Sequence, residues 1–362
     1  MNALSSSLSS PISRALVTHV CRRVDKLQLT DGLALPSGLA SGQIALAEVL
    51  RSDSQETVVL ADGMAHRLRP GTQLLVALGE ARSALGRSGS LPQAEGAFEL
   101  LTPHGLAGTE TTRGARLGAP LPLRLLGLAQ KHDRSVATLA DFAESPRGLR
   151  DQPRTYLMLG CSHRVGETQT LLAWTEGLSL QEGPGDLAVI LLGDWPVHDL
   201  PAHLLDAGAT HVLDASDLGL AQTHDLEGEA LITALDDLRT LAGLRGVRRC
   251  LIALGGGYTR PEVQRLLGTG KLPARIDGVM LAAADALSAR SVAFELQAHG
   301  LPLLGLSGDL ANSPLAIREA QPLDVPILPA LNLAEPAALV SLVALQYSQG
   351  RARNGARHNP FN

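Results

Sequence analysis

The sequence predicts an α/β protein in which a mainly parallel sheet covered by helices follows a small, β-rich, barrel-like domain. In the first third, short β-prone runs are separated by turn dipeptides. After Pro153, short apolar runs alternate with helical stretches. The chain has 362 residues, 45% of them hydrophobic and 19% charged, which suits two globular domains rather than a disordered chain.

The β-rich domain is predicted at residues 29–110. The Asp62-Gly63 and Pro70-Gly71 turn dipeptides separate runs that are rich in β-formers. The runs are Gln43–Val49, Glu56–Leu60, Met64–Arg69 and Gln73–Leu78. Such close spacing is typical of a small barrel or sandwich. No cluster of acids, bases or metal ligands stands out in this stretch of sequence, which favours a structural or interaction role.

The α/β domain is predicted at residues 154–346. Strands are expected at Tyr156–Leu159, Leu187–Leu192, His211–Leu213, Arg249–Leu254, Gly278–Ala282 and Pro302–Leu306. Helices are expected at Glu167–Glu176, Leu200–Ala207, Gly228–Leu241, Arg260–Leu267, Ala286–His299 and Ser313–Ala320. The alternation favours a parallel sheet covered on both faces, which binds ligands beyond the carboxyl ends of its strands.

The remaining segments are expected to carry little regular structure. Residues 1–28 form a flexible head and first strand, residues 111–153 a connector that mixes Gly, Pro and charge, and residues 347–362 a disordered tail.

Composition argues against several classes of partner and location. The net charge is −5 and aromatic residues make up 2%, so neither nucleic acid nor an anionic membrane surface is an expected partner. Apolar runs such as Leu187–Leu192 are too short to span a bilayer, and the N-terminus does not resemble a signal peptide. Cys21, Cys161 and Cys250 are widely spaced and indicate neither a disulfide framework nor a zinc site. We therefore predict a cytoplasmic protein.

The most informative segment, residues 156–170, reads YLMLGCSHRVGETQT. A predicted strand enters a turn bounded by Gly160 and Gly166, and a predicted helix follows. A phosphate-binding loop needs this layout, because backbone N–H groups converge on the anion and the helix N-terminus adds its dipole. The simpler alternative is an ordinary strand-to-helix turn.

The residue after the second glycine departs from the phosphate-loop pattern. That pattern places Lys there to reach the phosphates and Ser or Thr next to hold Mg²⁺. Here Thr168 is present, but Glu167 occupies the lysine position. One charge pair at about 4 Å in an effective dielectric of about 20 is worth on the order of 4 kcal/mol, so replacing attraction by repulsion penalises ATP in the usual pose.

The glycine-bounded loop resembles the longer P-loop of dethiobiotin synthetase-like proteins. More closely, it resembles a bacterial P-loop family of unknown function related to D-glutamate N-acetyltransferase-type proteins, here with a degenerate Walker A loop. Further stretches carry the resemblance over most of residues 30–330: Leu46–Val49, Arg69–Gly71, Gly193–Trp195, Asp206–Ala209, Ile276–Val279, Ala284–Ala286, Ser307-Gly308 and Ser313–Glu319. The resemblance implies a P-loop α/β fold and a role in small-molecule, amino-acid metabolism.

Two departures from the family pattern argue against an active enzyme. One is Glu167. The other is Gly255-Gly256-Gly257, which follows a predicted strand where the family has acidic residues, so no carboxylate remains there to organise Mg²⁺. We interpret these glycines as a loop that has lost its side chains, with close approach of a phosphate or another backbone as the alternative.

The candidate site residues follow from the loop and the resemblance. Cofactor contacts are expected from Gly160, Ser162, Gly166, Glu167, Thr168 and Arg318; Mg²⁺ ligands from Thr168 and Asp194; and catalytic groups from Asp194 and His163. Simpler interpretations are a turn or capping aspartate for Asp194, a surface histidine for His163 and a surface ion pair for Arg318.

Three functions compete. The first is a noncatalytic or weakly catalytic P-loop protein that binds a phosphate-bearing ligand or an active paralogue. The second is an amino-acid N-acyltransferase that uses acyl-CoA, with Asp194 or His163 deprotonating the amine. The third is an ATP-dependent ligase or kinase with a relocated lysine, such as Lys271. The candidate cofactors are ATP with Mg²⁺ and acetyl-CoA, and assembly into homo- or hetero-oligomers is compatible with all three.

Overall fold

The computed structural model describes residues 11–35, 38–51, 57–82, 86–92, 97–115, 117–148, 152–182, 186–193 and 199–329. The chain divides into two compact units. The first comprises Met1–Ser145, Pro196–Ala202 and Ala215–Thr223, and the second comprises Pro146–Trp195, His203–Asp214 and His224–Asn362. The predicted tail at 347–362 and the first ten residues of the predicted head lie outside the described residues.

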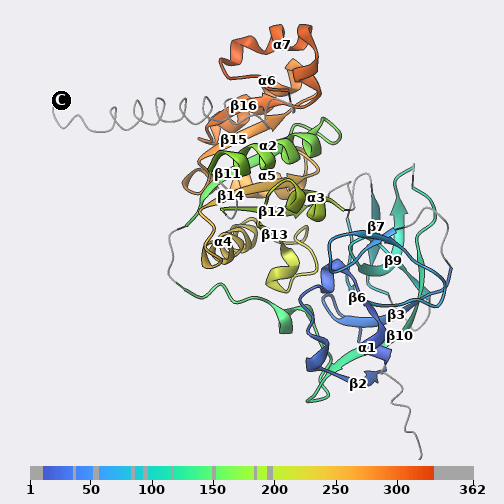
Figure 1. Ribbon diagram of the computed structural model, residues 1–362. Helices are drawn as coiled ribbons and strands as arrows, with labels where there is room; N and C mark the ends of the chain where they lie inside the picture. Colours follow the sequence, from blue (N-terminus) through green and yellow to red (C-terminus); the bar gives the residue numbers. More distant parts are fainter. Residues whose placement is uncertain are drawn as a thin grey trace, which may run out of the picture. The chain divides into compact units, whose positions relative to one another are not determined.

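The first unit is β-rich (Figure 1). Its described elements are α1 (Pro11–Arg14), β1 (Leu16–Val17), β2 (Leu29–Ala34), β3 (Ile44–Val49), β4 (Thr57–Val59), β5 (Ala65–Arg67), β6 (Gln73–Leu78), β7 (Arg87–Ser90), β8 (Ala97–Leu100), β9 (Leu106–Arg113) and β10 (Pro122–Lys131). The predicted turn at Gly63 joins β4 to β5 with φ +80°. Strand pairing runs β6-β3-β10-β8-β9 and returns from β9 to β6, so the hydrogen bonds of these strands form a cycle.

Strand alternation sorts the apolar side chains of this unit into two cores. Ala45, Ala47 and Val49 of β3 join one cluster with residues of β6, β8 and β10. Ile44 and Leu46 of the same strand join the other cluster, which includes residues of the N-terminal segment and of η3 (Leu139–Phe142). Both faces of β3 are therefore buried.

The predicted connector at 111–153 is a correction. It contains the whole of β10, which pairs with β2, β3 and β8. The glycines and prolines before residue 122 masked the strand in the sequence pattern, whereas Leu123 and Leu128 are almost completely buried.

The second unit is an α/β layer structure. Its six described strands are all parallel, in the order β13-β12-β14-β11-β15-β16. They are β11 (Arg154–Gly160), β12 (Leu187–Gly193), β13 (His211–Asp214), β14 (Arg249–Gly255), β15 (Gly278–Ala282) and β16 (Leu303–Ser307). The described α-helices are α2 (Glu167–Glu182), α3 (Leu200–Asp206), α4 (Gly228–Leu244), α5 (Pro261–Gly268), α6 (Ala286–Ala298) and α7 (Pro314–Ala320). Every strand and helix predicted for this half is confirmed, with ends that move by a few residues.

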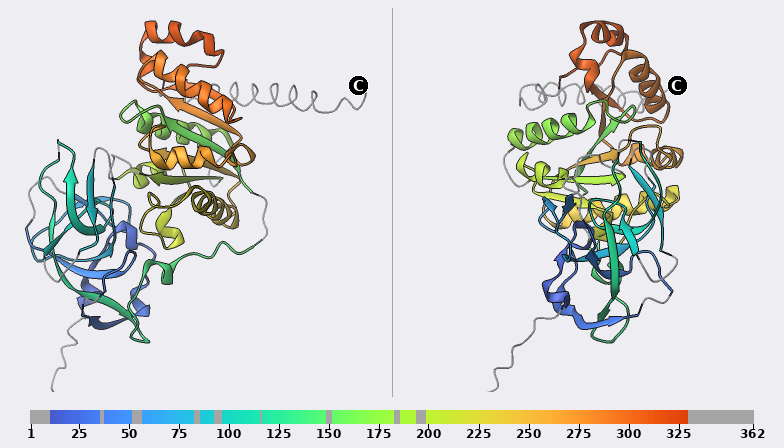
Figure 2. Two further views of the ribbon diagram at one scale, coloured as in Figure 1. Left: turned by 180° about the vertical axis from the view of Figure 1, so that it is seen from behind. Right: turned by 90° about the vertical axis from the view of Figure 1, so that its right-hand side faces the viewer.

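The strand order explains how the helices are divided between the two faces. The chain moves outward in one direction from β11 to β13 and in the other from β14 to β16, and right-handed crossovers then require opposite faces. Figure 2 shows α2 on one face and α4, α5 and α6 on the other. Near-continuous buried runs such as Leu187–Ile190 follow from this double cover. No helix of the described residues is long and apolar enough to cross a bilayer.

Candidate functional site

The predicted phosphate loop lies at the carboxyl edge of the sheet, between β11 and α2. The connections that follow neighbouring strands hold it through backbone hydrogen bonds. The N–H of Tyr258, after β14, donates to the carbonyl of Gly160 at 2.7 Å. The N–H of Asp309, after β16, donates to the carbonyl of Val165 at 3.1 Å. The strand–loop–helix layout predicted from the sequence is therefore present, at the edge where such sheets bind ligands.

Two glycines allow the neighbouring connections to approach the loop this closely. Both adopt positive φ, +82° at Gly257 and +83° at Gly308. A β-carbon on Gly257 would lie 2.8 Å from the Cα of Ser162, and one on Gly308 only 2.1 Å from the carbonyl oxygen of Val165. The interpretation of Gly255–Gly257 as a loop that merely lost its side chains is therefore wrong, because Gly257 makes room for another backbone.

Glu167 fills the loop that it follows. Only 4% of its surface is exposed, and its Oε2 accepts a hydrogen bond from the N–H of Val165 at 3.3 Å. The same oxygen lies 3.0 Å from the point where a β-carbon on Gly160 would stand. The backbone N–H groups of Arg164 and of Glu167 itself lower the pKa of this carboxyl. The loop N–H of Val165 thus binds the chain's own carboxylate.

The carboxylate of Glu167 is held at a net electrostatic cost. Burial raises its pKa above the ordinary value, although the loop N–H groups and the nearby imidazole of His163 lower it. Its second oxygen, Oε1, is buried and has no hydrogen-bond partner within the described part of the chain. The loop therefore accommodates this anion only partly.

The other predicted loop residues take up different environments. Ser162 is exposed and Thr168 is half-buried in the first turn of α2. Gly166 adopts φ +82° and contacts the backbone of the residue that follows β16, so it serves the loop conformation. His163 is half-buried, and its Nε2 has no hydrogen-bond partner among the described residues.

Two predicted residues are not brought to the loop. Asp194, a candidate catalytic group and Mg²⁺ ligand, lies outside the described residues. Arg318 is exposed in the last turn of α7, and within the described ranges no hydrogen bond or ion pair links it to the loop. The magnesium pair of Thr168 and Asp194 therefore stays a prediction.

The structure adds features that the sequence did not indicate. Arg164 adopts φ +61° within the loop and is exposed. Arg260 is buried and ion-paired with Glu262, and a β-carbon on Gly256 would contact its side chain. In the sequence, Arg260 stands just before Pro261 at the start of α5. This pattern is typical of an ordinary helix start and gives no sign of a buried ion pair.

Cys161 lies at the start of the loop but is not an activated thiol. Burial raises its pKa to about 12, and the charge of Asp285 adds to this effect. A neutral, buried thiol is a poor nucleophile, as expected from the absence of a partner in the sequence.

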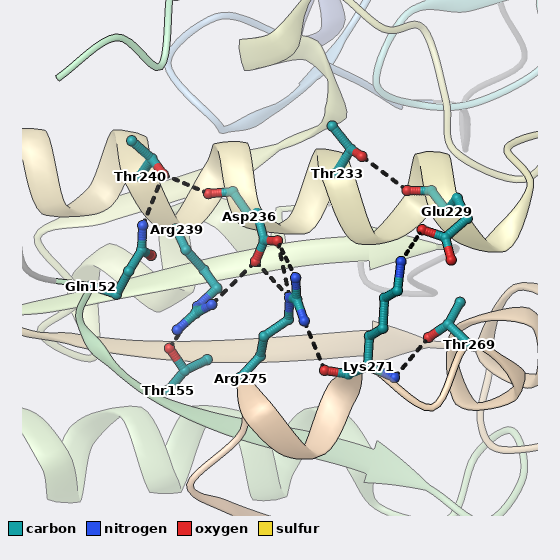
Figure 3. A network of polar contacts seen from close by, with 10 residues as sticks. All are labelled: Gln152, Thr155, Glu229, Thr233, Asp236, Arg239, Thr240, Thr269, Lys271 and Arg275. Carbon is teal, nitrogen blue, oxygen red and sulfur yellow. Dashed lines mark hydrogen bonds and ion pairs between the residues drawn. The ribbon is translucent and has the colours of Figure 1, made fainter. Parts of the chain in front are cut away.

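Lys271, the candidate relocated lysine, belongs to a different polar network (Figure 3). It lies between α5 and η5 (Leu272–Ala274), and its Nζ pairs with Glu229 of α4 at 2.5 Å. In the same network, Arg275 forms ion pairs with Asp236 of α4. This lysine connects α4 to the segment before β15.

Comparisons with known proteins do not place the chain in a family. No family model and no curated protein matches it. Among solved structures, chloroplast FtsY from Physcomitrella patens is similar at 14% identity and a TM-score of 0.33, over 52% of this chain and 62% of that one. A nucleotide-binding protein from Archaeoglobus fulgidus, solved in complex with ADP, is similar at 12% identity and a TM-score of 0.32, over 50% of this chain and 85% of that one. The chain thus spans less than two thirds of the FtsY chain, and likenesses this low carry no argument about function. The resemblance to the bacterial P-loop family stays a prediction.

Proposed function

We propose that this chain is a noncatalytic or weakly catalytic protein on a phosphate-loop scaffold, which binds a phosphate-bearing ligand or an active paralogue in small-molecule, amino-acid metabolism. One observation carries the proposal. The loop after β11 directs backbone N–H groups at an anion, but that anion is the carboxylate of Glu167, at the position where nucleotide turnover needs a lysine.

The chemistry of phosphoryl transfer supports the noncatalytic part. Catalysis of that reaction is mostly positioning and stabilisation of negative charge by Lys, Arg and Mg²⁺. Here the lysine position carries a carboxylate, and β14 ends in glycines that offer no acidic Mg²⁺ ligand. The N–H groups of the loop remain, and they are sufficient to hold a phosphate without turnover.

Calorimetric titration tests this proposal. We expect wild type to bind acetyl-CoA or another phosphate-bearing ligand. We expect it to bind Mg-ATP only weakly and not to hydrolyse it. Glu167→Lys is expected to gain ATP affinity, because attraction replaces repulsion beside the phosphates. Mg²⁺-dependent ATP hydrolysis by wild type that Thr168→Ala abolishes would overturn the noncatalytic assignment.

The buried Nε2 of His163 favours a second candidate, an amino-acid N-acyltransferase. An imidazole nitrogen with no hydrogen-bond partner in the described structure is a candidate base for deprotonating an amine, and the phosphates of acyl-CoA need no lysine to sit on backbone amides. Transfer of acetyl from acetyl-CoA to a panel of amino acids, lost in His163→Gln, is the expected result. No transfer to any member of the panel would remove this candidate.

A further inference from the structure

The backbone of residues 164–167 forms a cradle around one oxygen of Glu167. The N–H of Val165 donates to Oε2 at 3.3 Å, and the N–H groups of Arg164 and Glu167 lower the pKa of the same carboxyl. Converging N–H groups at the start of a sixteen-residue helix form a site for an anion. The chain supplies that anion itself.

We propose that this cradle is a site for a single oxyanion, which the resting protein fills with the Glu167 carboxylate and which a phosphate or carboxylate group of a ligand occupies by displacing it. The proposal rests on the proposed function, since it describes how a phosphate-bearing ligand gains access to the same loop. Glu167 is then the residue that sets the apparent affinity of the site.

The fit of Glu167 explains why it is displaceable. Its Oε1 is buried without a hydrogen-bond partner in the described structure, so only one of its two oxygens is satisfied. Burial also penalises its charge more than the cradle compensates. A phosphate brings more acceptor oxygens than a carboxylate, so it can accept hydrogen bonds from the same donors with more of its oxygens.

Backbone contacts from the neighbouring connection hold the loop independently of the anion in the cradle. Gly308 supports the carbonyl of Val165 through a contact that no β-carbon would permit, and the N–H of Asp309 hydrogen-bonds the same carbonyl. Both contacts engage the carbonyl of Val165, whereas its N–H donates to Glu167. Exchange of the anion therefore needs movement of the Glu167 side chain and not of the loop.

Chemical rescue of the full-length chain tests the proposal. Glu167→Ala empties the cradle, and Glu176→Ala is the matched control, because it removes the same charge from an exposed position of the same helix. Thermal unfolding and calorimetry are followed with inorganic phosphate and with acetate, against chloride at equal ionic strength. Glu167→Ser is the second variant in case the alanine variant does not fold.

We expect phosphate or acetate to raise the unfolding temperature of Glu167→Ala but not that of the Glu176→Ala control. The affinity of Glu167→Ala for phosphate should exceed that of wild type by about tenfold or more, because the competent, Glu-out state is a minor one in wild type. Rescue by acetate as well as phosphate identifies a general oxyanion site, and rescue by phosphate alone identifies a phosphate site.

Two results would overturn the inference. In the first, neither phosphate nor acetate stabilises Glu167→Ala or Glu167→Ser. In the second, wild type binds phosphate as tightly as the alanine variant does. The second result would leave the proposed function standing. Conversely, if phosphate rescues Glu167→Ala while neither wild type nor Glu167→Lys binds Mg-ATP or acetyl-CoA, the ligand-binding part of the proposed function fails and the self-filled cradle remains.

Discussion

At the scale of single residues, the conformation of the loop depends on the absence of a side chain at Gly308. Gly308 and Gly246 have nearly equal φ, +83° and +84°, but a β-carbon on Gly308 would lie 2.1 Å from the carbonyl oxygen of Val165, whereas one on Gly246 would meet open space. A positive φ costs an alanine about 1–2 kcal/mol. At Gly308 the ψ of −158° also places the backbone in a region that is essentially restricted to glycine, where another residue costs about 1–3 kcal/mol. Overpacking adds about 1–3 kcal/mol at Gly308 alone.

We therefore predict that Gly308→Ala lowers the free energy of unfolding by more than Gly246→Ala, as measured by urea denaturation. Gly246→Ala is the control for a positive φ without a clash. Equal losses in the two variants would show that the loop after β16 yields without cost and does not fix the loop at Val165.

The chemistry of Glu167 was predictable from the sequence only in part. Its place after Gly166 showed that a negative charge replaces the expected positive one. The direction of the side chain depends on which backbone N–H groups face inward, and neighbouring strand connections set that through Gly257 and Gly308. Such contacts join residues far apart in the chain, so no local pattern reveals them.

At the scale of elements, α6 depends on Asp285 as its N-cap. The Asp285 side chain accepts a hydrogen bond from the N–H of Ser288 at 2.9 Å, and this bond lowers the pKa of the carboxyl. Asp285→Ala should cost about 1 kcal/mol of stability. Asp285→Asn should cost less at neutral pH, because the amide keeps an acceptor oxygen.

The pH dependence of this cap has a definite sign. Because the folded pKa lies below the ordinary value of 3.8, the charged cap contributes stability above that value and loses it as the pH falls through the folded pKa. The stability difference between wild type and Asp285→Asn should therefore shrink on acidification below about pH 4. Urea denaturation between pH 7 and pH 3 measures it, and a constant difference would contradict the role of the charge.

The elements of the α/β half were predictable because two signals coincide there. Apolar runs long enough for buried strands alternate with helical patterns, as β15 at Gly278–Ala282 illustrates. Ends were less certain: α2 continues through Gly177 to Glu182, beyond the expected Glu176, and the sequence Gly-Pro-Gly follows at 183–185. In the β-rich half, β10 was missed because Gly and Pro precede it.

At the scale of the whole molecule, the division into units does not follow the sequence order. The pattern change at Pro153 predicted a single boundary, but Ala215–Thr223 belongs to the β-rich unit although it lies between β13 and α4 of the other. Hydrophobic periodicity identifies helices and strands, but it does not show which core a short connecting segment packs into. The membership of residues 215–223 could therefore not be predicted from the sequence.

Asp217 shows the physical reason for that membership. Its side chain is fully buried and pairs with Arg22 at 2.5 Å and with Arg23 at 2.7 Å, both within the β-rich unit. Arg22 is itself largely buried, so removing the carboxylate leaves a cation in a poorly solvated place. We predict that Asp217→Asn destabilises this unit by on the order of 3 kcal/mol.

Amide hydrogen exchange resolved by peptide mass spectrometry measures where that loss falls. Peptides from β3, β6 and β10 should exchange faster in Asp217→Asn, whereas peptides from β11 and β14 should keep their wild-type rates, since a buried ion pair stabilises the core that it belongs to. Glu319→Gln, at an exposed position of α7, is the control for loss of one negative charge. If β11 and β14 exchange faster instead, Asp217 stabilises the α/β unit. The segment at 215–223 would then contribute to the stability of the unit whose strands and helices flank it in the sequence.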